Sequence, residues 1–283
     1  MFGKYRTILW AAAFGLAYVE SLPPASVIAT ERPHPIVDLK GGYLLGGTRR
    51  GQWLEADVIA KSLKRPIRYR LYSLDGPVGQ GVGTRPTSAG EACPETLVVE
   101  IKPTGRVPRF KEAALAVAAD WNSMPRPVHK TATSSETYRR VVADVLMRAG
   151  IARPDVRIDQ ILRVDLDGDG TDEVLITANR HKGYPGQPDQ MGPDAAAGDY
   201  SLVLLRKVYK GKVRPVVLHA EFYPAGKRST APSKQTIAAV LDLDGDGRME
   251  IAVKGRHYEA DWMTVYKIVG LKAHVVLSEG CEP

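Results

Sequence analysis

The chain has 283 residues, 44% of them hydrophobic and 25% charged, and its formal net charge is +7. This is an ordinary globular composition, and the length suffices for one large domain or two smaller ones. The basic residues are scattered among acids in no long run, which favours a solvated surface and argues against a nucleic-acid partner.

Residues 1–29 have the layout of a secretory signal peptide. Lys4 and Arg6 form a basic start, Thr7–Val19 is an uncharged apolar run, and Val27-Ile28-Ala29 offers small side chains for cleavage. We therefore expect a secreted or extracytoplasmic protein, in the periplasm or at the cell surface. Its mature net charge is +6, because cleavage removes two basic residues and one acid. The apolar run is short for a bilayer span, so an uncleaved anchor is the second interpretation, and we expect no membrane span in the mature chain.

Residues 30–125 predict an N-terminal unit that mixes strands with a short helix. The stretch 41–47 predicts a strand between glycine pairs, and the apolar spacing of 53–63 predicts the helix. Residues 67–81 predict a hairpin around an Asp-Gly turn. The stretch 112–120 fits either a strand or a helix.

Residues 126–155 predict a linker and then the clearest helix in the sequence. Prolines in the preceding stretch disfavour regular structure there. Ser134 or Ser135 is the expected N-cap, and Gly150 is the expected stop. The helix carries an apolar stripe that predicts packing against a core, formed by Tyr138, Val141, Val142, Val145 and Leu146.

Residues 156–283 predict two copies of one β unit. Each copy consists of strand, acidic loop, strand, connection, strand, hairpin and strand, and the first connection is the Gly/Pro-rich stretch 183–198. Four antiparallel strands per copy make a propeller blade or a similar repeated sheet. The predicted fold class is therefore mainly β with one or two helices. It consists of repeated four-stranded antiparallel units in a propeller-like or partial-propeller arrangement.

The two acidic loops are the strongest chemical signal. "DLDGDGTDE" begins at Asp165 and "DLDGDGRME" at Asp242, so acids stand at positions 1, 3, 5 and 9, with glycine at position 6. Position 7 can offer a backbone carbonyl. The predicted metal ligands are Asp165, Asp167, Asp169, Thr171 and Glu173 in the first loop, and Asp242, Asp244, Asp246, Arg248 and Glu250 in the second.

Alternate carboxylates on a curled loop point toward one centre, where their repulsion calls for a cation. Only hard oxygen ligands are present, which selects Ca²⁺ over Zn²⁺, copper or the more rigidly octahedral Mg²⁺. An EF-hand would need a glutamate at position 12 between two helices. Ile176 and Val253 stand there instead, after predicted strands begin. The sequence thus predicts two structural Ca²⁺ ions, and a solvated Asp-Gly turn is the alternative.

"VDLDGDGTDEVLI" and "LDLDGDGRMEIAV" resemble the calcium loops of FG-GAP/VCBS-type repeats, the blades of integrin-α-like β-propellers. The resemblance covers residues 159–279 and rests on the loop motif. It implies that the same ten residues hold two ions, with Thr171 and Arg248 contributing their carbonyl oxygens. The Phe-Gly-Gly-Ala-Pro signature is absent, and two units are too few to close a propeller.

Two smaller signals leave alternatives open. Cys93 and Cys281 are the only cysteines, and an exported chain permits a disulfide between them, with two free buried thiols as the alternative. Arg180-His181 and Arg256-His257 follow the outgoing strands of the two copies. They are either paired cationic positions that face a ligand or inheritance from a duplicated unit.

The sequence contains no nucleophile–base motif, although Asp120 beside Trp121, or Glu259 with Asp261, offers carboxylates for a glycan cleft. The favoured function is a calcium-stabilised binding or interaction module whose exposed loops hold an unknown protein or glycan partner. An extracytoplasmic hydrolase acting on a glycan or another cell-envelope substrate is the alternative. A purely structural envelope protein is a third interpretation.

Overall fold

The computed structural model describes residues 32–181, 183 and 191–282. The predicted signal peptide, 1–29, lies outside these residues, as does part of the connection 183–198. The described chain is mainly β with two α-helices, which confirms the predicted fold class. Among the described residues, no helix has the length and apolar character that crossing a membrane requires.

The first part of the chain forms a seven-stranded antiparallel sheet with the order β3-β2-β1-β9-β4-β5-β8. Its strands are β1 (His34–Asp38), β2 (Leu44–Arg49), β3 (Gln52–Leu54), β4 (Ile67–Ser73), β5 (Gly76–Gly83), β8 (Ile101–Pro103) and β9 (Leu115–Val117). A small ribbon of β6 (Thr87–Ser88) and β7 (Leu97–Val98) projects from it. The helix predicted over 53–63 is short, since β3 takes its first residues and α1 spans only Ala56–Ala60.

The two predicted copies form two further antiparallel sheets. The five-stranded sheet contains β10 (His129–Thr131), β11 (Ile158–Val164), β12 (Glu173–Arg180), β13 (Asp199–Tyr209) and β14 (Lys212–Tyr223), in that order. The four-stranded sheet contains β15 (Lys234–Leu241), β16 (Glu250–Arg256), β17 (Asp261–Val269) and β18 (Lys272–Cys281). Strand β10 comes from the predicted linker and pairs with β11, so part of that linker is regular.

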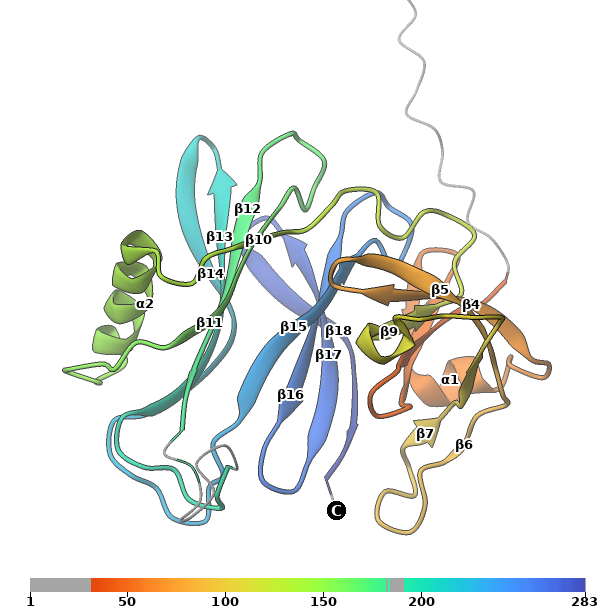
Figure 1. The fold of residues 1–283 in the computed structure, drawn as a ribbon, viewed down its shortest axis with the longest axis horizontal. Helices are drawn as coiled ribbons and strands as arrows, with labels where there is room; N and C mark the ends of the chain where they lie inside the picture. The colour runs from red at the N-terminus through yellow and green to blue at the C-terminus, as the bar shows by residue number, and fades with distance from the viewer. Residues whose placement is uncertain (1–31, 182, 184–190, 283) are drawn as a thin grey trace, which may run out of the picture.

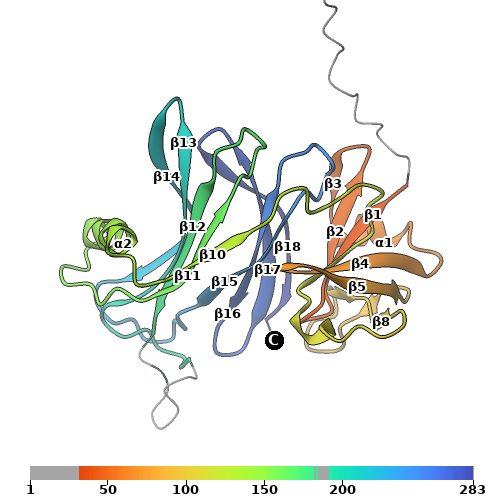
Figure 2. The same ribbon diagram turned by 45° about the horizontal axis from the view of Figure 1, so that its top comes forward.

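The four-stranded sheet lies between the other two and is buried on both faces (Figures 1 and 2). Successive side chains of a strand point to opposite faces, so β16 sends Ile251 one way and Ala252 the other. The core shared with the five-stranded sheet includes Leu162, Val164, Leu175, Val203, Val240, Ile251 and Val253. The core shared with the seven-stranded sheet includes Ile36, Leu45, Leu115, Leu241, Ala252, Met263 and Val265.

Helices cover the two outer faces of this stack (Figure 1). Helix α2 (Glu136–Arg148) packs Val142 and Leu146 against the outer face of the five-stranded sheet. Ile59 of α1 packs against the outer face of the seven-stranded sheet. Because a helix occupies each outer face, the three described sheets stack like neighbouring blades but do not close into a ring.

Helix α2 agrees with its sequence prediction. Ser135 takes the N-cap position without a side-chain hydrogen bond, and Gly150 has a φ of 93° just after the last turn. A left-handed residue at this position ends a helix at no cost for glycine. The apolar stripe packs on the sheet, as expected for a core-facing helix.

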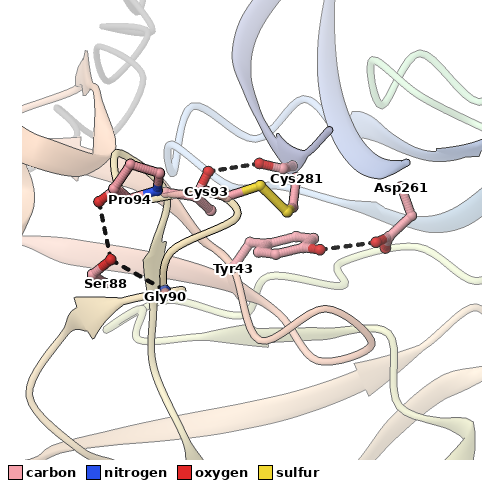
Figure 3. Close-up of a disulfide and its surroundings, with 9 residues drawn as sticks. Tyr43, Ser88, Gly90, Cys93, Pro94, Asp261 and Cys281 are labelled. Carbon is pink, nitrogen blue, oxygen red and sulfur yellow. Dashed lines mark hydrogen bonds between the residues drawn. A yellow bond between two sulfur atoms is a disulfide. The ribbon is translucent and has the colours of Figure 1, made fainter. Parts of the chain in front are cut away.

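The seam between the seven-stranded and four-stranded sheets carries polar and covalent links as well as apolar packing (Figure 3). The Tyr43 hydroxyl donates to Asp261 over 2.8 Å, and the Lys254 ammonium lies 2.7 Å from the buried carboxylate of Asp38. Cys93, in the loop between β6 and β7, lies at disulfide distance from Cys281, with their Cα atoms 5.7 Å apart. In each of these contacts, one partner lies in the N-terminal third of the chain and the other in the four-stranded sheet.

Replacing Cys93 and Cys281 by serine should lower the free energy of unfolding by about 2–4 kcal/mol, because the crosslink restricts the unfolded chain. The bridge spans 188 residues, so the restricted loop is long. Urea unfolding with and without reductant measures this: reductant should destabilise the parent protein and leave the double variant unchanged. Two reactive thiols per chain in denaturant without reductant would contradict the pairing.

Candidate metal centres

Both acidic loops lie at the same end of the molecule, at the top of Figure 1. The first acidic loop (residues 165–173) connects β11 to β12, and the second acidic loop (residues 242–250) connects β15 to β16. The backbone N–H of Met249 donates to the carbonyl of Leu166 over 2.8 Å, so the two loops touch directly. The face-to-face stacking of the two sheets brings them together.

Each loop is curled around its first aspartate. Asp165 accepts hydrogen bonds from the N–H groups of Gly168 (2.7 Å) and Gly170 (3.0 Å). Asp242 accepts the equivalent bonds from Gly245 (2.7 Å) and Gly247 (3.1 Å). These four glycines have φ between 78° and 84°, a left-handed conformation that other residues rarely adopt. The two loops therefore share one backbone conformation, which the Asp-x-Asp-Gly-Asp-Gly spacing requires.

The structure brings together three carboxylates in each loop. Oxygen atoms of Asp165, Asp167 and Glu173 lie within 4.8 Å of one another, as do those of Asp242, Asp244 and Asp246. Both clusters can hold a metal ion. Asp169 and Glu250 are the predicted carboxylate ligands outside these clusters. At position 5, Asp169 and Asp246 each accept a hydrogen bond from the backbone N–H of position 7, at 2.7 and 2.8 Å. The carbonyl ligands predicted at Thr171 and Arg248 stay predictions.

A lysine from the neighbouring strand reaches into each cluster. The Lys207 ammonium on β13 donates to Asp167 (2.6 Å) and to Glu173 (2.9 Å). On β17, the Lys267 ammonium donates to Asp244 and, over 2.8 Å, to Asp246. Each lysine lies across the sheet from its position-9 glutamate, since Val174 pairs with Arg206 and Ile251 with Tyr266. An ammonium group thus offsets part of the repulsion between the aspartates.

One ammonium does not balance the carboxylates at positions 1, 3, 5 and 9. Burial, followed by the charge of Asp244, raises the pKa of Glu250 to about 8 despite the opposing effect of Lys267. Burial likewise raises the pKa of Asp242 to about 6, although two backbone hydrogen bonds oppose it. In the first loop burial raises the pKa of Glu173 against the hydrogen bond from Lys207. A raised pKa means that the negative form of each carboxylate is destabilised in the loop, and an added cation would stabilise it.

Two carboxylate oxygens are buried without a hydrogen-bond partner: Asp167 Oδ1 and Glu250 Oε1. Glu250 is only 1% exposed; its Oε1 lies 3.4 Å from the Lys267 ammonium without a hydrogen bond, and its other oxygen accepts the N–H of Leu243 over 2.9 Å. A buried carboxylate oxygen that lacks a partner is costly. Both oxygens belong to the acidic loops, which identifies these loops as the part of the described chain where a cation would satisfy an unmet demand.

The connector between β9 and β10 crosses the end of the molecule that holds both loops (Figure 1). The Trp121 indole N–H donates to the carbonyl of Asp242 over 2.9 Å. Further along, the Arg126 guanidinium donates to the carbonyls of Asp165 and Leu166 in the first loop and of Gly247 (2.8 Å) in the second. One side chain therefore bridges the backbones of the two loops.

The other residues singled out from the sequence lie elsewhere. His181 Nδ1 is buried without a hydrogen-bond partner, whereas His257 Nδ1 accepts backbone N–H groups of its own turn, so the two Arg-His pairs make different contacts. Arg180 pairs with Asp199 at 2.8 Å. Asp261 bonds Tyr43 and Lys254 in the sheet seam. Asp120 lines a surface cavity beside Trp121.

Sequence analysis missed the two lysines and Arg126. A signal for the lysines exists: each follows an apolar run in its strand and stands three or four residues before the glycine of a turn, Lys207 before Gly211 and Lys267 before Gly270. Only the strand register shows that this charge faces the glutamate. Arg126 lies in a proline-rich connector, and nothing in its local pattern indicates its partners.

Comparisons of the chain with protein-family models, with curated proteins and with solved structures find no match. What the acidic loops do must therefore follow from their own geometry.

Replacing Lys207 by methionine should destabilise the metal-free protein by about 3–5 kcal/mol, because it leaves buried carboxylates without their ammonium partner. Lys212→Met is the matched control, since Lys212 is exposed on the next strand. Urea unfolding in EDTA measures both variants. Equal losses for the two would show that Lys207 does not hold the cluster.

Proposed function

We propose that this protein is an exported, calcium-stabilised β-repeat protein that acts as a binding or interaction module. The observation that carries the proposal is the pair of acidic loops with one backbone conformation and with buried carboxylate oxygens that accept no hydrogen bond. The FG-GAP/VCBS-type resemblance of residues 159–279 is part of the same proposal. Two Ca²⁺ ions, one for each loop, are its cofactors.

The ligand set fits Ca²⁺ better than other common cations. All side-chain donors are carboxylate oxygens, which disfavours Zn²⁺ and copper. Ca²⁺ accepts six to eight oxygens in flexible geometry, whereas Mg²⁺ demands a tight octahedron. Asp165, Asp167 and Glu173 would hold one ion, with Asp169 and the Thr171 carbonyl completing the site. Asp242, Asp244 and Asp246 would hold the other, with Glu250 and the Arg248 carbonyl.

The arrangement favours a structural role for the ions. The loops join strand ends and contact each other and the β9–β10 connector through backbone groups. An ion that binds only the folded loops stabilises the folded state by mass action. Such ions would make one end of the stack rigid and leave its surface available for a partner.

The geometry favours binding over hydrolysis. His219, Glu221 and Ser233 do meet, and the Ser233 hydroxyl donates to Glu221 over 2.7 Å. However, the same nitrogen, His219 Nε2, lies 3.4 Å from that hydroxyl and 3.2 Å from the glutamate, so the histidine cannot relay a proton between them. Ser233 is also only 2% exposed, out of reach of a substrate.

The calcium proposal predicts a rise in melting temperature when millimolar Ca²⁺ replaces EDTA. With a dissociation constant of about 10⁻⁴–10⁻³ M, about 1 mM free Ca²⁺ stabilises each site by about 0.4–1.4 kcal/mol. Thermal melts in Ca²⁺ and, separately, in Mg²⁺ measure the effect. Mg²⁺ should give the smaller shift.

Asp165→Ala combined with Asp242→Ala should abolish the calcium-dependent shift. Asp172→Ala is the matched control, because Asp172 lies in the first loop but pairs with Arg163 on the surface. A parent protein that melts at the same temperature in EDTA and in Ca²⁺ would end the calcium proposal.

Export predicts a mature chain that starts at Thr30, after cleavage behind Ala29. Mass spectrometry of the protein from fractionated cells of its native host measures both the N-terminus and the compartment. An intact Met1 on protein recovered from the cytoplasm would contradict export and leave the calcium sites as a separate question.

A further inference from the structure

A cavity of about 420 Å³ opens beside the start of β1, and basic side chains dominate its rim. We call it the basic pocket. Arg32, Lys64 and Arg65 line it, with Asp120 as the single carboxylate. Pro33 and Ile67 add apolar wall. Its residues come from the strand start, from the segment between α1 and β4, and from the end of β9.

The three cations of the basic pocket make no ion pair with any carboxylate in the described part of the chain. Three basic groups and one acid give the lining a formal charge of +2. Behind the pocket, the Arg49 guanidinium donates to the hydroxyl of Ser62, another lining residue. Arg49 Nε is buried without a hydrogen-bond partner. Cationic groups that line one cavity without a paired carboxylate repel one another, so an anion in the pocket is stabilising.

We propose that the basic pocket binds the phosphate group of a small phosphorylated ligand, such as a sugar phosphate. A phosphate dianion matches the formal charge of the lining, and its terminal oxygens accept from several donors at once. Arginine presents a planar fork that binds phosphate oxygens in pairs, and lysine adds a point charge. The apolar wall formed by Pro33 and Ile67 suits the carbon skeleton that carries the phosphate.

The pocket and the second acidic loop are joined by contacts of Asp120 and Trp121, which are neighbours in the chain. Asp120 lines the pocket, and the next residue, Trp121, donates to the carbonyl of Asp242. The Trp121 ring also contacts the ring of His34, another lining residue, with centroids 4.7 Å apart. The proposal rests on the proposed binding role, and it names the ligand class and the place where that ligand binds.

Isothermal titration of the protein in millimolar Ca²⁺ with glucose 1-phosphate tests the proposal, with glucuronate and glucose as the singly charged and neutral probes. We expect binding to glucose 1-phosphate, weaker binding to glucuronate and none to glucose. Inorganic phosphate as a fourth probe separates recognition of the phosphate alone from recognition of the sugar phosphate, which should bind more tightly.

Lys64→Ala combined with Arg65→Ala should weaken glucose 1-phosphate binding about tenfold or more, because each lost charged hydrogen bond contributes at least that much. Lys102→Ala combined with Arg106→Ala removes the same charge from exposed positions of the same sheet region and should leave affinity unchanged. Equal weakening in the two double variants, or glucuronate binding as tight as glucose 1-phosphate, would overturn the assignment.

The same titration in EDTA separates this proposal from the calcium proposal. Pocket-dependent binding of glucose 1-phosphate to a protein that shows no calcium shift would support the pocket and refute only the calcium sites. A clear calcium shift with no glucose 1-phosphate binding would refute the pocket and leave the calcium sites standing.

Discussion

The insertion of a strand lysine between loop carboxylates is the interaction on which this architecture depends. Without Lys207 and Lys267, each turn that joins the first two strands of a unit would concentrate acids beside a buried core. The lysine comes from the third strand, so the charge balance of the loop also fixes the register of that strand. Loop chemistry and sheet geometry are therefore one constraint, and it operates twice in the chain. The ammonium leaves Asp167 Oδ1 and Glu250 Oε1 without a hydrogen bond, in loops whose acidic clusters can hold a metal ion.

The constraint also gathers charged groups at one end of the molecule. Both acidic loops, the Arg126 bridge and the Trp121 contact lie at one edge of the sheets. The cores between the sheets are mainly apolar, with paired polar contacts such as Asn179 with Gln235 and Lys254 with Asp38. The Arg126 guanidinium donates to backbone carbonyls of both loops and so links them through one positive charge. The same connector, between β9 and β10, supplies Asp120 to the lining of the basic pocket. The connector therefore contacts both the basic pocket and the two acidic loops.

How far the sequence leads depends on whether a feature is local. The acidic loops, helix α2 and the Asp-Gly hairpin of β4 and β5 are encoded by spacing within a few residues, and the structure has all of them. The mainly β class follows from the same local patterns. The partner of Glu173 could not be read in this way, because it lies 34 residues away and depends on strand register. The seven-stranded sheet likewise depends on long-range pairings such as β1 with β9, which no local pattern specifies. The stretch 112–120 was ambiguous for the same reason, and it resolves into a 3₁₀ turn and strand β9.

The order of the sheets in space differs from their order along the chain, and this has a consequence for how the protein is made. The middle sheet is formed by residues 234–281, which are translated after both flanking sheets. Until they emerge, the inner faces of both flanking sheets have no partner, and apolar residues such as Leu45 and Val203 stay in water. Cys281 ends the last strand of that sheet, so the covalent link to Cys93 can close only after the middle sheet has emerged. Nascent chains of this protein therefore expose two apolar sheet faces until residues 234–281 emerge and cover them.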